Sequence, residues 1–543
     1  MSVVEPDVNW LRAVPSSGET DARYSEGAMK RAFAFLLILT ASSLIWAAAR
    51  KGSVREISMS DLRDKIEGGW AGQMIGVSYG APTEFRYMEK MIEGPIPEWK
   101  PDRITNSLNQ DDLYVDMTFA KVLDDKGLNA TTEDFGAMFR EADYSLWHAN
   151  LAARRALKRG VPAMEAGTPK YNAHANDIDF QIEADFIGLM APGLPQWTNE
   201  ASWRAGRVMN HGDGIYGGMF VSAMYSSAFF ENDPRKIVEA GLAVLPSRSP
   251  YAQLIGDVLA WHKQHPEDWK QNWKLIEQKW NKREPCPDGA LRPFNIDAKL
   301  NGAYIALGLL YGGSDFFRTM DISTRSGQDS DCNPSSACGV LGVMMGYKRI
   351  PDQFKSYIPK IADEKFKYTD FSFRTIVAST EKRAVDLVKL TGGSVEGDRL
   401  QVKTQAARPA KLELWDNYGS PVERIASSDA RWTWKGPWKE NKVTRMASEN
   451  GAEVSITFQG TGAILVGPYL PTGGKADVYL DGKLDRTVDV YPDEPHTKGG
   501  ESVWHAFGLK NGKHHVRLAV RGETYSDSKG TDIGITDLVV FRP

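Results

Sequence analysis

Cysteine is scarce in this sequence, which contains only Cys286, Cys332 and Cys338 among 543 residues. Three cysteines exclude a disulfide framework, and no Cys-x-x-Cys or Cys/His spacing indicates a zinc site. A large excess of charge is missing too, because 66 basic and 70 acidic residues leave a formal net charge of −4. This balance gives no reason to expect nucleic acid or a basic membrane surface as a partner.

One apolar run stands out near the N-terminus. It begins at Met29, reads MKRAFAFLLILTASSLIWAAA, and joins a short basic start to an alanine-rich end. This pattern is typical of a secretory signal peptide over residues 29–49; an uncleaved membrane anchor is the alternative. The polar residues 1–28 ahead of it indicate a start codon assigned too early. We expect a secreted or periplasmic protein that starts near Arg50, with no membrane contact beyond the signal peptide.

The length predicts two or three domains, and the pattern of apolar residues changes near residue 392. Residues 50–392 repeat apolar residues at three- and four-residue spacings, which predicts one all-α domain with a large core. Residues 393–410 are expected to form a linker. Residues 411–543 alternate polar and apolar residues between turns such as Asp481-Gly482, which predicts an all-β, jelly-roll-like sandwich.

Two acidic groups interrupt apolar segments of the helical part. The first, NQDDLYVDMTF, contains Asp111, Asp112 and Asp116, and the second, SGQDSDCN, contains Asp329 and Asp331. Neighbouring carboxylates are costly to bury unless a cation or hydrogen-bond donors compensate them. Magnesium and calcium prefer oxygen ligands. The residues therefore allow two interpretations, a shared metal site or salt-bridged structural acids.

A glycine-spaced segment precedes these acidic groups. EGGWAGQMIGVSYGAPTEF has glycine at positions 68, 72, 76 and 80, which predicts a helix with a smooth face for close packing. The helix is expected to break at Ala81-Pro82 and to deliver Glu84 into a cleft. We expect Glu84 to act there as a general acid or base.

A further acidic stretch, NDIDFQIEADF, contains Asp179, Glu183 and Asp185. A charged helix face is the plainer interpretation of this density. The alternative is that one of the three supplies a second catalytic carboxyl. On that alternative, the predicted catalytic carboxyls are Glu84, Asp112 and Asp185.

Together these segments resemble the ADP-ribosylglycohydrolase family over roughly residues 55–355. The family's glycine helix, Thr-Asp-Asp motif and closing G-D-x-D-[ST] motif appear as GQMIGVSYGAPTEF, QDD and GQDSDCN, and GRVMNHGDGIYGGMF resembles its His-containing helix start. The resemblance implies an all-α fold with Glu84 beside a bound sugar. It implies a pair of magnesium ions held by Asp111, Asp112, Asp329 and Asp331. We expect substrate contacts from Gln110, Asp116, His211, Asp213 and Asn333.

Three residues depart from the family pattern. Gln110 and Cys332 replace hydroxyl residues of the two motifs, and Ser78 stands where aspartate is frequent. A neutral thiol is a poor magnesium ligand. One metal of the pair is therefore expected to be shifted, weakened or replaced by calcium.

The C-terminal part resembles the galactose-binding-like and carbohydrate-binding-module-like sandwiches that are appended to secreted glycan-active enzymes. Together with the predicted export, this favours a secreted, metal-dependent glycoside hydrolase with a carbohydrate substrate. Glycosidic bonds break through an oxocarbenium-like transition state, for which a carboxyl pair is the usual apparatus. An ADP-ribosyl hydrolase is the first alternative. A non-catalytic glycan-binding protein is the second, and the retained acidic motifs count against it.

Overall fold

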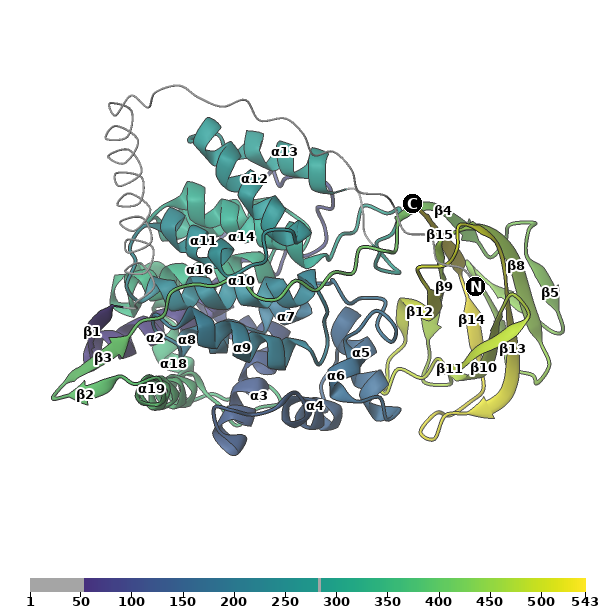
Figure 1. The fold of residues 1–543 in the computed structure, drawn as a ribbon, viewed down its shortest axis with the longest axis horizontal. Helices are drawn as coiled ribbons and strands as arrows, with labels where there is room; N and C mark the ends of the chain where they lie inside the picture. The colour runs from purple at the N-terminus through teal and green to yellow at the C-terminus, as the bar shows by residue number, and fades with distance from the viewer. Residues whose placement is uncertain (1–52, 282–284) are drawn as a thin grey trace, which may run out of the picture. The chain divides into compact units, whose positions relative to one another are not determined.

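The computed structural model describes residues 53–281 and 285–543 (Figure 1). The predicted extension, residues 1–28, and the predicted signal peptide, residues 29–49, lie outside the described residues. Across the described ranges, no helix is both long and apolar enough to cross a membrane. Residues 53–543 form one unit, with the helices first and the strands after them. The predicted order of an all-α domain followed by an all-β domain is therefore confirmed.

Two helices, α2 (Met59–Gly80) and α16 (Cys332–Met345), pack with their backbones in direct contact. A Cβ atom at glycine 68, 72, 76 or 80 would overlap the carbonyl oxygen of residue 342, 338, 334 or 330, respectively. The glycines and the carbonyls both recur every four residues, which is the spacing of one helix face. The predicted glycine face is thus confirmed, and it brings the end of α2 against the start of α16.

The other helices of the domain pack around this pair or on one another. They are η1 (Pro101–Asn109), α3 (Asp111–Lys126), α4 (Thr132–Glu141), α5 (His148–Lys158), α6 (Ala163–Ala166), α7 (Asp179–Ile182), α8 (Asp185–Leu189), α9 (Pro195–Gly206), α10 (Asp213–Ala228), α11 (Pro234–Ala243), α12 (Pro250–Gln264), α13 (Trp269–Trp280), α14 (Ala298–Gly312), α15 (Phe316–Arg325), η2 (Tyr347–Arg349), α17 (Asp352–Lys355), α18 (Ile358–Ile361) and α19 (Phe373–Leu390). Helices α10, α14 and α16 are buried along nearly their whole length, as expected for segments that are apolar on every side.

The segment predicted to be a linker, residues 393–410, is partly regular structure. It contains β2 (Ser394–Glu396) and β3 (Arg399–Lys403), and β3 pairs antiparallel with both β2 and β1 (Val54–Ser58). Leu400 and Val402 on β3 are fully buried. The segment after α19 therefore forms a small sheet with β1, the first strand of the chain's described part. Residues 394–403 belong to this sheet and are not a linker.

The C-terminal strands form antiparallel sheets whose main pair packs face to face. One sheet has the order β11-β10-β13-β8-β5 and the other β12-β9-β15-β4, with a smaller sheet β14-β7-β6 beside them. The strands are β4 (Ser420–Ala426), β5 (Thr433–Lys435), β6 (Lys439–Asn441), β7 (Thr444–Ala447), β8 (Glu453–Gly460), β9 (Gly462–Tyr469), β10 (Gly474–Leu480), β11 (Lys483–Asp489), β12 (Lys498–Ala506), β13 (Gly512–Thr524), β14 (Ile533–Ile535) and β15 (Asp537–Arg542). Alternate residues of β8 and β13 are buried, which is the pattern of a sheet with one face in the core.

Helix α5 lies beside the sandwich (Figure 1), and charged side chains join the two domains there. Arg154 Nη2 lies 2.6 Å from Glu494 Oε1, and both side chains are buried. Arg159 Nη2 lies 2.6 Å from Asp489 Oδ1, and the Arg155 guanidinium lies 3.7 Å from the centre of the Tyr469 ring. Buried ion pairs of this kind hold a fixed geometry. They bring β12 to the edge of the helical domain.

Candidate functional site

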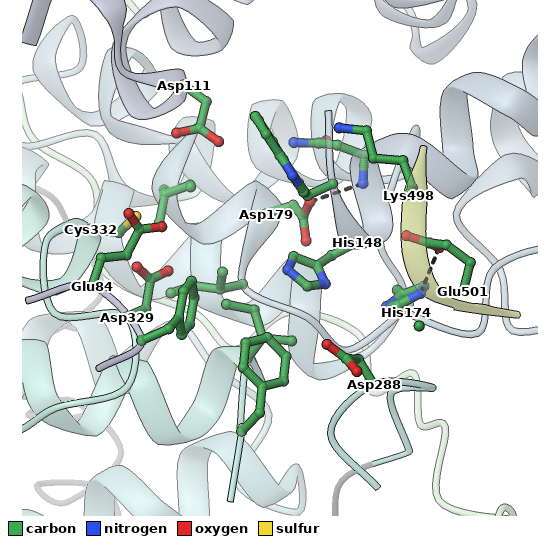
Figure 2. Close-up of a pocket in the computed structure, with 18 of the residues that line it drawn as sticks. Glu84, Asp111, His148, His174, Asp179, Asp288, Asp329, Cys332, Lys498 and Glu501 are labelled. Atoms are coloured by element: carbon green, nitrogen blue, oxygen red, sulfur yellow. Dashed lines mark hydrogen bonds and ion pairs between the residues drawn. The ribbon is translucent and has the colours of Figure 1, made fainter. Parts of the chain in front are cut away.

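A cavity of about 470 Å³ lies where the ends of α2, α3 and α5 meet β12. Its wall includes Glu84, Asp111 and Asp329 from the helical domain, and Lys498 and Glu501 from the sandwich. Figure 2 shows the carboxyl groups of Glu84, Asp111 and Asp329 directed toward the same open space. Two domains that are separate in sequence therefore share one cavity.

Backbone contacts between two loops bring Glu84 to this wall. Helix α2 ends at Gly80, as the Ala81-Pro82 pair predicts, and the turn that follows packs on the loop before α16. The Phe85 amide donates to the Gln328 carbonyl at 3.0 Å, and Thr83 Oγ1 lies 2.8 Å from Ser330 Oγ. These bonds hold Glu84 beside the second acidic motif.

Four aspartates form an acidic cluster under this wall, defined as Asp111, Asp112, Asp329 and Asp331. The first two open α3, where the free amides of the helix start favour negative charge. The last two precede α16, and ligand atoms of both lie within 4.8 Å of the Cys332 thiol. The Cys332 thiol also donates to Asp112 Oδ2 at 3.3 Å. The structure thus brings together the two motifs that the sequence places more than two hundred residues apart.

Hydrogen-bond donors compensate the acidic cluster only in part. Asp112 Oδ1 and Asp329 Oδ1 are buried, and neither has a hydrogen-bond partner among the described residues. Burial, followed by the charges of Asp331 and Asp111, raises the pKa of Glu84 to about 8. Burial also raises the pKa of Asp331 to about 6 and lifts that of Asp112 well above its ordinary value. Orphaned oxygen ligands in an electronegative pocket fit a hard divalent cation.

Three predicted site residues lie behind the cavity wall. Asp116 is fully buried and accepts from the Phe186 amide at 3.1 Å, and Asp185 is buried close to it. Asn333 is fully buried and donates to Asn301 Oδ1 at 2.9 Å. The described lining of the cavity includes none of the three. The expected substrate contacts of Asp116 and Asn333 and the catalytic role of Asp185 are therefore not supported by their positions.

His211 and Asp213 lie at a different place. His211 Nδ1 is 3.2 Å from Arg207 Nη1 and 3.6 Å from Glu413 Oε2. Asp213 lines a second cavity of about 310 Å³ together with Lys299. The motif that resembles the family's His-containing helix start therefore does not contribute these two side chains to the acidic site, contrary to the expectation. Gln110, by contrast, does line the main cavity.

Sequence reasoning missed several residues of the opposite wall. His148, His174, Trp147, Lys498 and Glu501 all line the cavity. None lies in a recognisable motif, and the last two come from the sandwich, so no local pattern indicates them. Asp179, one of the three open candidates for a second carboxyl, does reach this wall. It accepts from the Asn150 amide at 2.9 Å, and burial raises its pKa to about 7.

Comparisons with known proteins agree with the helical architecture and its motifs. The family model described as ADP-ribosylglycohydrolase matches residues 58–383. A curated "A type blood alpha-D-galactosamine galactosaminidase" of Flavonifractor plautii is 33% identical over 103 residues, which are 18% of this chain and 9% of that protein's length.

Two solved structures show weaker likeness. One is an "ADP-ribosylglycohydrolase-related protein complex" at 15% identity and a TM-score of 0.39, covering 60% of this chain and 98% of that one. The other is the CBM36-1 domain of a multidomain xylanase from a Trinervitermes trinervoides hindgut metagenome. It has 15% identity and a TM-score of 0.17, and the match covers 22% of this chain and 94% of that one. The family model spans more than half of the 543 residues. The chain therefore belongs to the ADP-ribosylglycohydrolase family, whose members are hydrolases that act on glycosidic bonds.

Proposed function

We propose that this protein is a metal-dependent glycoside hydrolase that cleaves a glycosidic bond of a carbohydrate outside the cytoplasm. The observation that carries the proposal is the shared cavity, in which Glu84 lies beside the acidic cluster of the helical domain and residues of a sandwich strand line the opposite side. Burial raises the pKa of Glu84. The apolar run over residues 29–49 supports the location.

The acidic cluster would hold the metal, through Asp111, Asp112, Asp329 and Asp331. Magnesium fits these carboxylates, and calcium is the alternative because Cys332 is a weak ligand for either ion and leaves a looser oxygen shell. When bound, the ion would offset the carboxylate charges and act as a Lewis acid toward sugar hydroxyls. Gln110 lies at the cavity wall and offers an amide oxygen beside the same group.

Two carboxyl groups on the wall fit the acid and base roles of glycoside hydrolysis. Glu84, with a pKa of about 8, keeps its proton near neutral pH and can donate it to the leaving-group oxygen. Asp179, with a pKa of about 7, is partly ionised under the same conditions and can accept a proton from a water molecule. Because the two carboxyls have different pKa values, Glu84 fits the role of general acid and Asp179 that of general base.

The charges of the wall favour a neutral sugar over an ADP-ribosyl group, the second candidate substrate. Among the described residues that line the cavity, Lys498 is the only lysine or arginine. Its Nζ is already 3.1 Å from Glu494 Oε2 and 4.0 Å from the centre of the Trp147 ring. A pyrophosphate in this cavity would therefore lie near several carboxylates and near one cation, Lys498, which already contacts Glu494 and Trp147. The half-exposed Trp147 ring offers instead an apolar face on which a sugar ring can stack.

A substrate screen tests the proposal. Purified protein is incubated with a panel of oligosaccharides and with ADP-ribosylated peptides, with magnesium, with calcium or with a chelator, and product is followed by mass spectrometry. We expect sugar release that depends on the metal and is abolished in Glu84→Gln. Release of ADP-ribose without cleavage of any oligosaccharide would establish the alternative substrate, and no product from either panel would favour a binding protein.

A further inference from the structure

A second group of ligand-type side chains lies on the other wall of the cavity. We call it the histidine–cysteine cluster and define it as His148, His174, Asp177 and Cys286. One ligand atom of each lies within 4.8 Å of the others. The four come from three segments: His148 from the start of α5, His174 and Asp177 from the loop before α7, and Cys286 from the loop after α13. Figure 2 shows His148 and His174 apart from the side of the cavity that carries Asp111 and Asp329.

The distances within this cluster are those of a metal site whose ligands have only to adjust slightly. His174 Nδ1 is 2.7 Å from Asp177 Oδ2 and 3.2 Å from Cys286 Sγ, and His148 Nδ1 is 3.9 Å from Asp177 Oδ2. Tetrahedral zinc with bonds of about 2.0–2.3 Å places neighbouring ligand atoms about 3.3–3.8 Å apart. The observed separations bracket that interval.

The same atoms do not form a nucleophile–base relay. In a Cys-His-Asp relay the thiol and the carboxylate contact opposite nitrogens of the imidazole ring. Here Cys286 Sγ and Asp177 Oδ2 both approach Nδ1 of His174. Cys286 and Asp177 are also fully buried, so a substrate in the cavity does not reach the thiol. Four ligand atoms of different kinds that lie within 4.8 Å of one another fit coordination of an ion.

The remaining nitrogen of His174 faces a carboxylate of the kind that usually orients a metal-bound imidazole. His174 Nε2 lies 3.6 Å from Glu501 Oε2, and both atoms are buried without a hydrogen-bond partner within the described chain. A histidine that ligates a metal usually donates its other N–H to a carboxylate or carbonyl, which fixes the ring orientation. Glu501 belongs to β12, so this contact would tie the sandwich to the site. Asp177 Oδ1 is a third buried oxygen for which the described residues supply no donor.

His148 is held in a strained position beside this group. Its backbone φ is +45°, in the left-handed region that residues other than glycine rarely adopt. Its ring stacks on Phe294, with centroids 5.5 Å apart. Strain of this kind persists where the surrounding structure requires one side-chain position.

We propose that the histidine–cysteine cluster binds one zinc ion, at a site distinct from the acidic cluster. Imidazole, thiolate and a single carboxylate are ligands that zinc accepts, whereas magnesium and calcium prefer the all-oxygen acidic cluster. Four protein ligands make a closed, structural site. Bound zinc would fix the loop that carries Cys286, the loop that carries His174 and, through Glu501, strand β12. It would thus set the shape of the wall that faces Glu84.

Cobalt spectroscopy tests this site without reference to activity. Chelator-treated protein is titrated with Co²⁺, a tetrahedral stand-in for zinc whose thiolate complexes absorb in the near ultraviolet. We expect one thiolate-to-cobalt band that saturates at one ion per chain in the wild type, is lost in Cys286→Ser and is kept in Cys332→Ser. The Cys332 variant is the matched control, because that thiol lies in the acidic cluster. A wild type without the band, or a band that depends on Cys332 instead, would overturn the proposal.

A second measurement does not depend on the folding of the cysteine variant. Zinc affinity is measured by competition with a chromogenic chelator in the wild type, in Glu501→Gln and in Glu523→Gln, an exposed glutamate elsewhere in the sandwich. Loss of the carboxylate that orients His174 should weaken zinc binding about 10–100-fold. The Glu523 variant should match the wild type. Equal zinc affinity in all three proteins would contradict the role assigned to Glu501, and no zinc binding by the wild type would refute the site itself.

Discussion

Thr83 Oγ1 lies 2.8 Å from Ser330 Oγ, and this buried contact joins the turn that carries Glu84 to the loop that carries Asp329 and Asp331. Thr83 Oγ1 also donates to the Gly80 carbonyl at 2.8 Å. Thr83→Val keeps the shape of the side chain but removes both bonds. The buried Ser330 hydroxyl loses its partner, whereas the Gly80 carbonyl keeps the bond from the Thr83 amide. We expect a loss of about 1–3 kcal/mol in the free energy of unfolding. Urea denaturation measures it, with Thr105→Val as the control because the exposed Thr105 makes a similar bond to a carbonyl three residues earlier. An equally small loss of stability in Thr83→Val and Thr105→Val would show that the contact between Thr83 and Ser330 does not stabilise the fold.

The glycine face of α2 should tolerate no side chain. A Cβ atom at Gly72 would overlap the Cys338 carbonyl group, which belongs to the backbone of α16 and cannot turn away. Gly72→Ala is expected to destabilise the protein by about 3 kcal/mol or more. Gly256→Ala is the matched control, because Gly256 also lies within a helix but faces open space. That change should stabilise the fold by about 0.5–1 kcal/mol. Denaturation midpoints that rise in both variants would disprove the close packing.

Metal binding should depend on the acidic cluster. Asp329→Asn and Asp111→Asn each remove one charged ligand, and we expect calorimetry to show loss of magnesium binding in both. Asp352→Asn, at an aspartate whose side chain is 92% exposed, should bind magnesium like the wild type. Unchanged magnesium affinity in the Asp329 and Asp111 variants would show that these aspartates are structural and do not bind the metal.

Glu84→Gln should separate catalysis from folding. The substitution keeps the size and hydrogen-bonding capacity of the side chain but removes the proton that Glu84 is expected to transfer. We expect turnover to fall about 10²-fold or more, with the melting temperature and magnesium affinity nearly unchanged. Glu93→Gln, at an exposed glutamate in the loop that follows, is the control. Turnover close to that of the wild type would move the acid–base role elsewhere, with Asp179 as the first candidate.

The metal-free protein should lose stability as the pH rises. Burial raises the pKa of Glu84 from 4.5 to about 8 and that of Asp331 from 3.8 to about 6. Between the ordinary and the raised values the folded state holds protons that the unfolded state has released, so stability falls with increasing pH across that window and is fully present below it. Melting temperatures measured from pH 4.5 to about 8 with a chelator should therefore decrease. Saturating magnesium should flatten the decrease, and a decrease that magnesium leaves unchanged would argue against a metal at these carboxyls.

Local sequence patterns determined the two fold classes and the glycine face. Helix and strand periodicities are properties of neighbouring residues, so the change near residue 392 was visible without coordinates. The break after Gly80 follows from Pro82, because proline cannot continue the hydrogen-bond ladder of a helix. The family motifs then indicated that Asp111 and Asp329 would meet, and the structure places both on one cavity.

Only the tertiary structure decided what faces Glu84 across the cavity. Strand β12 reaches the wall through ion pairs between the domains, and Cys286 meets His174 from a loop more than one hundred residues away, so no spacing indicates either contact. The same reason explains why His211 and Asp213 lie away from the main cavity and why Asp185 lies behind its wall, although the chemistry of all three fits a site. Residue types and spacings report local conformation, whereas a site is formed by segments that long-range packing brings together.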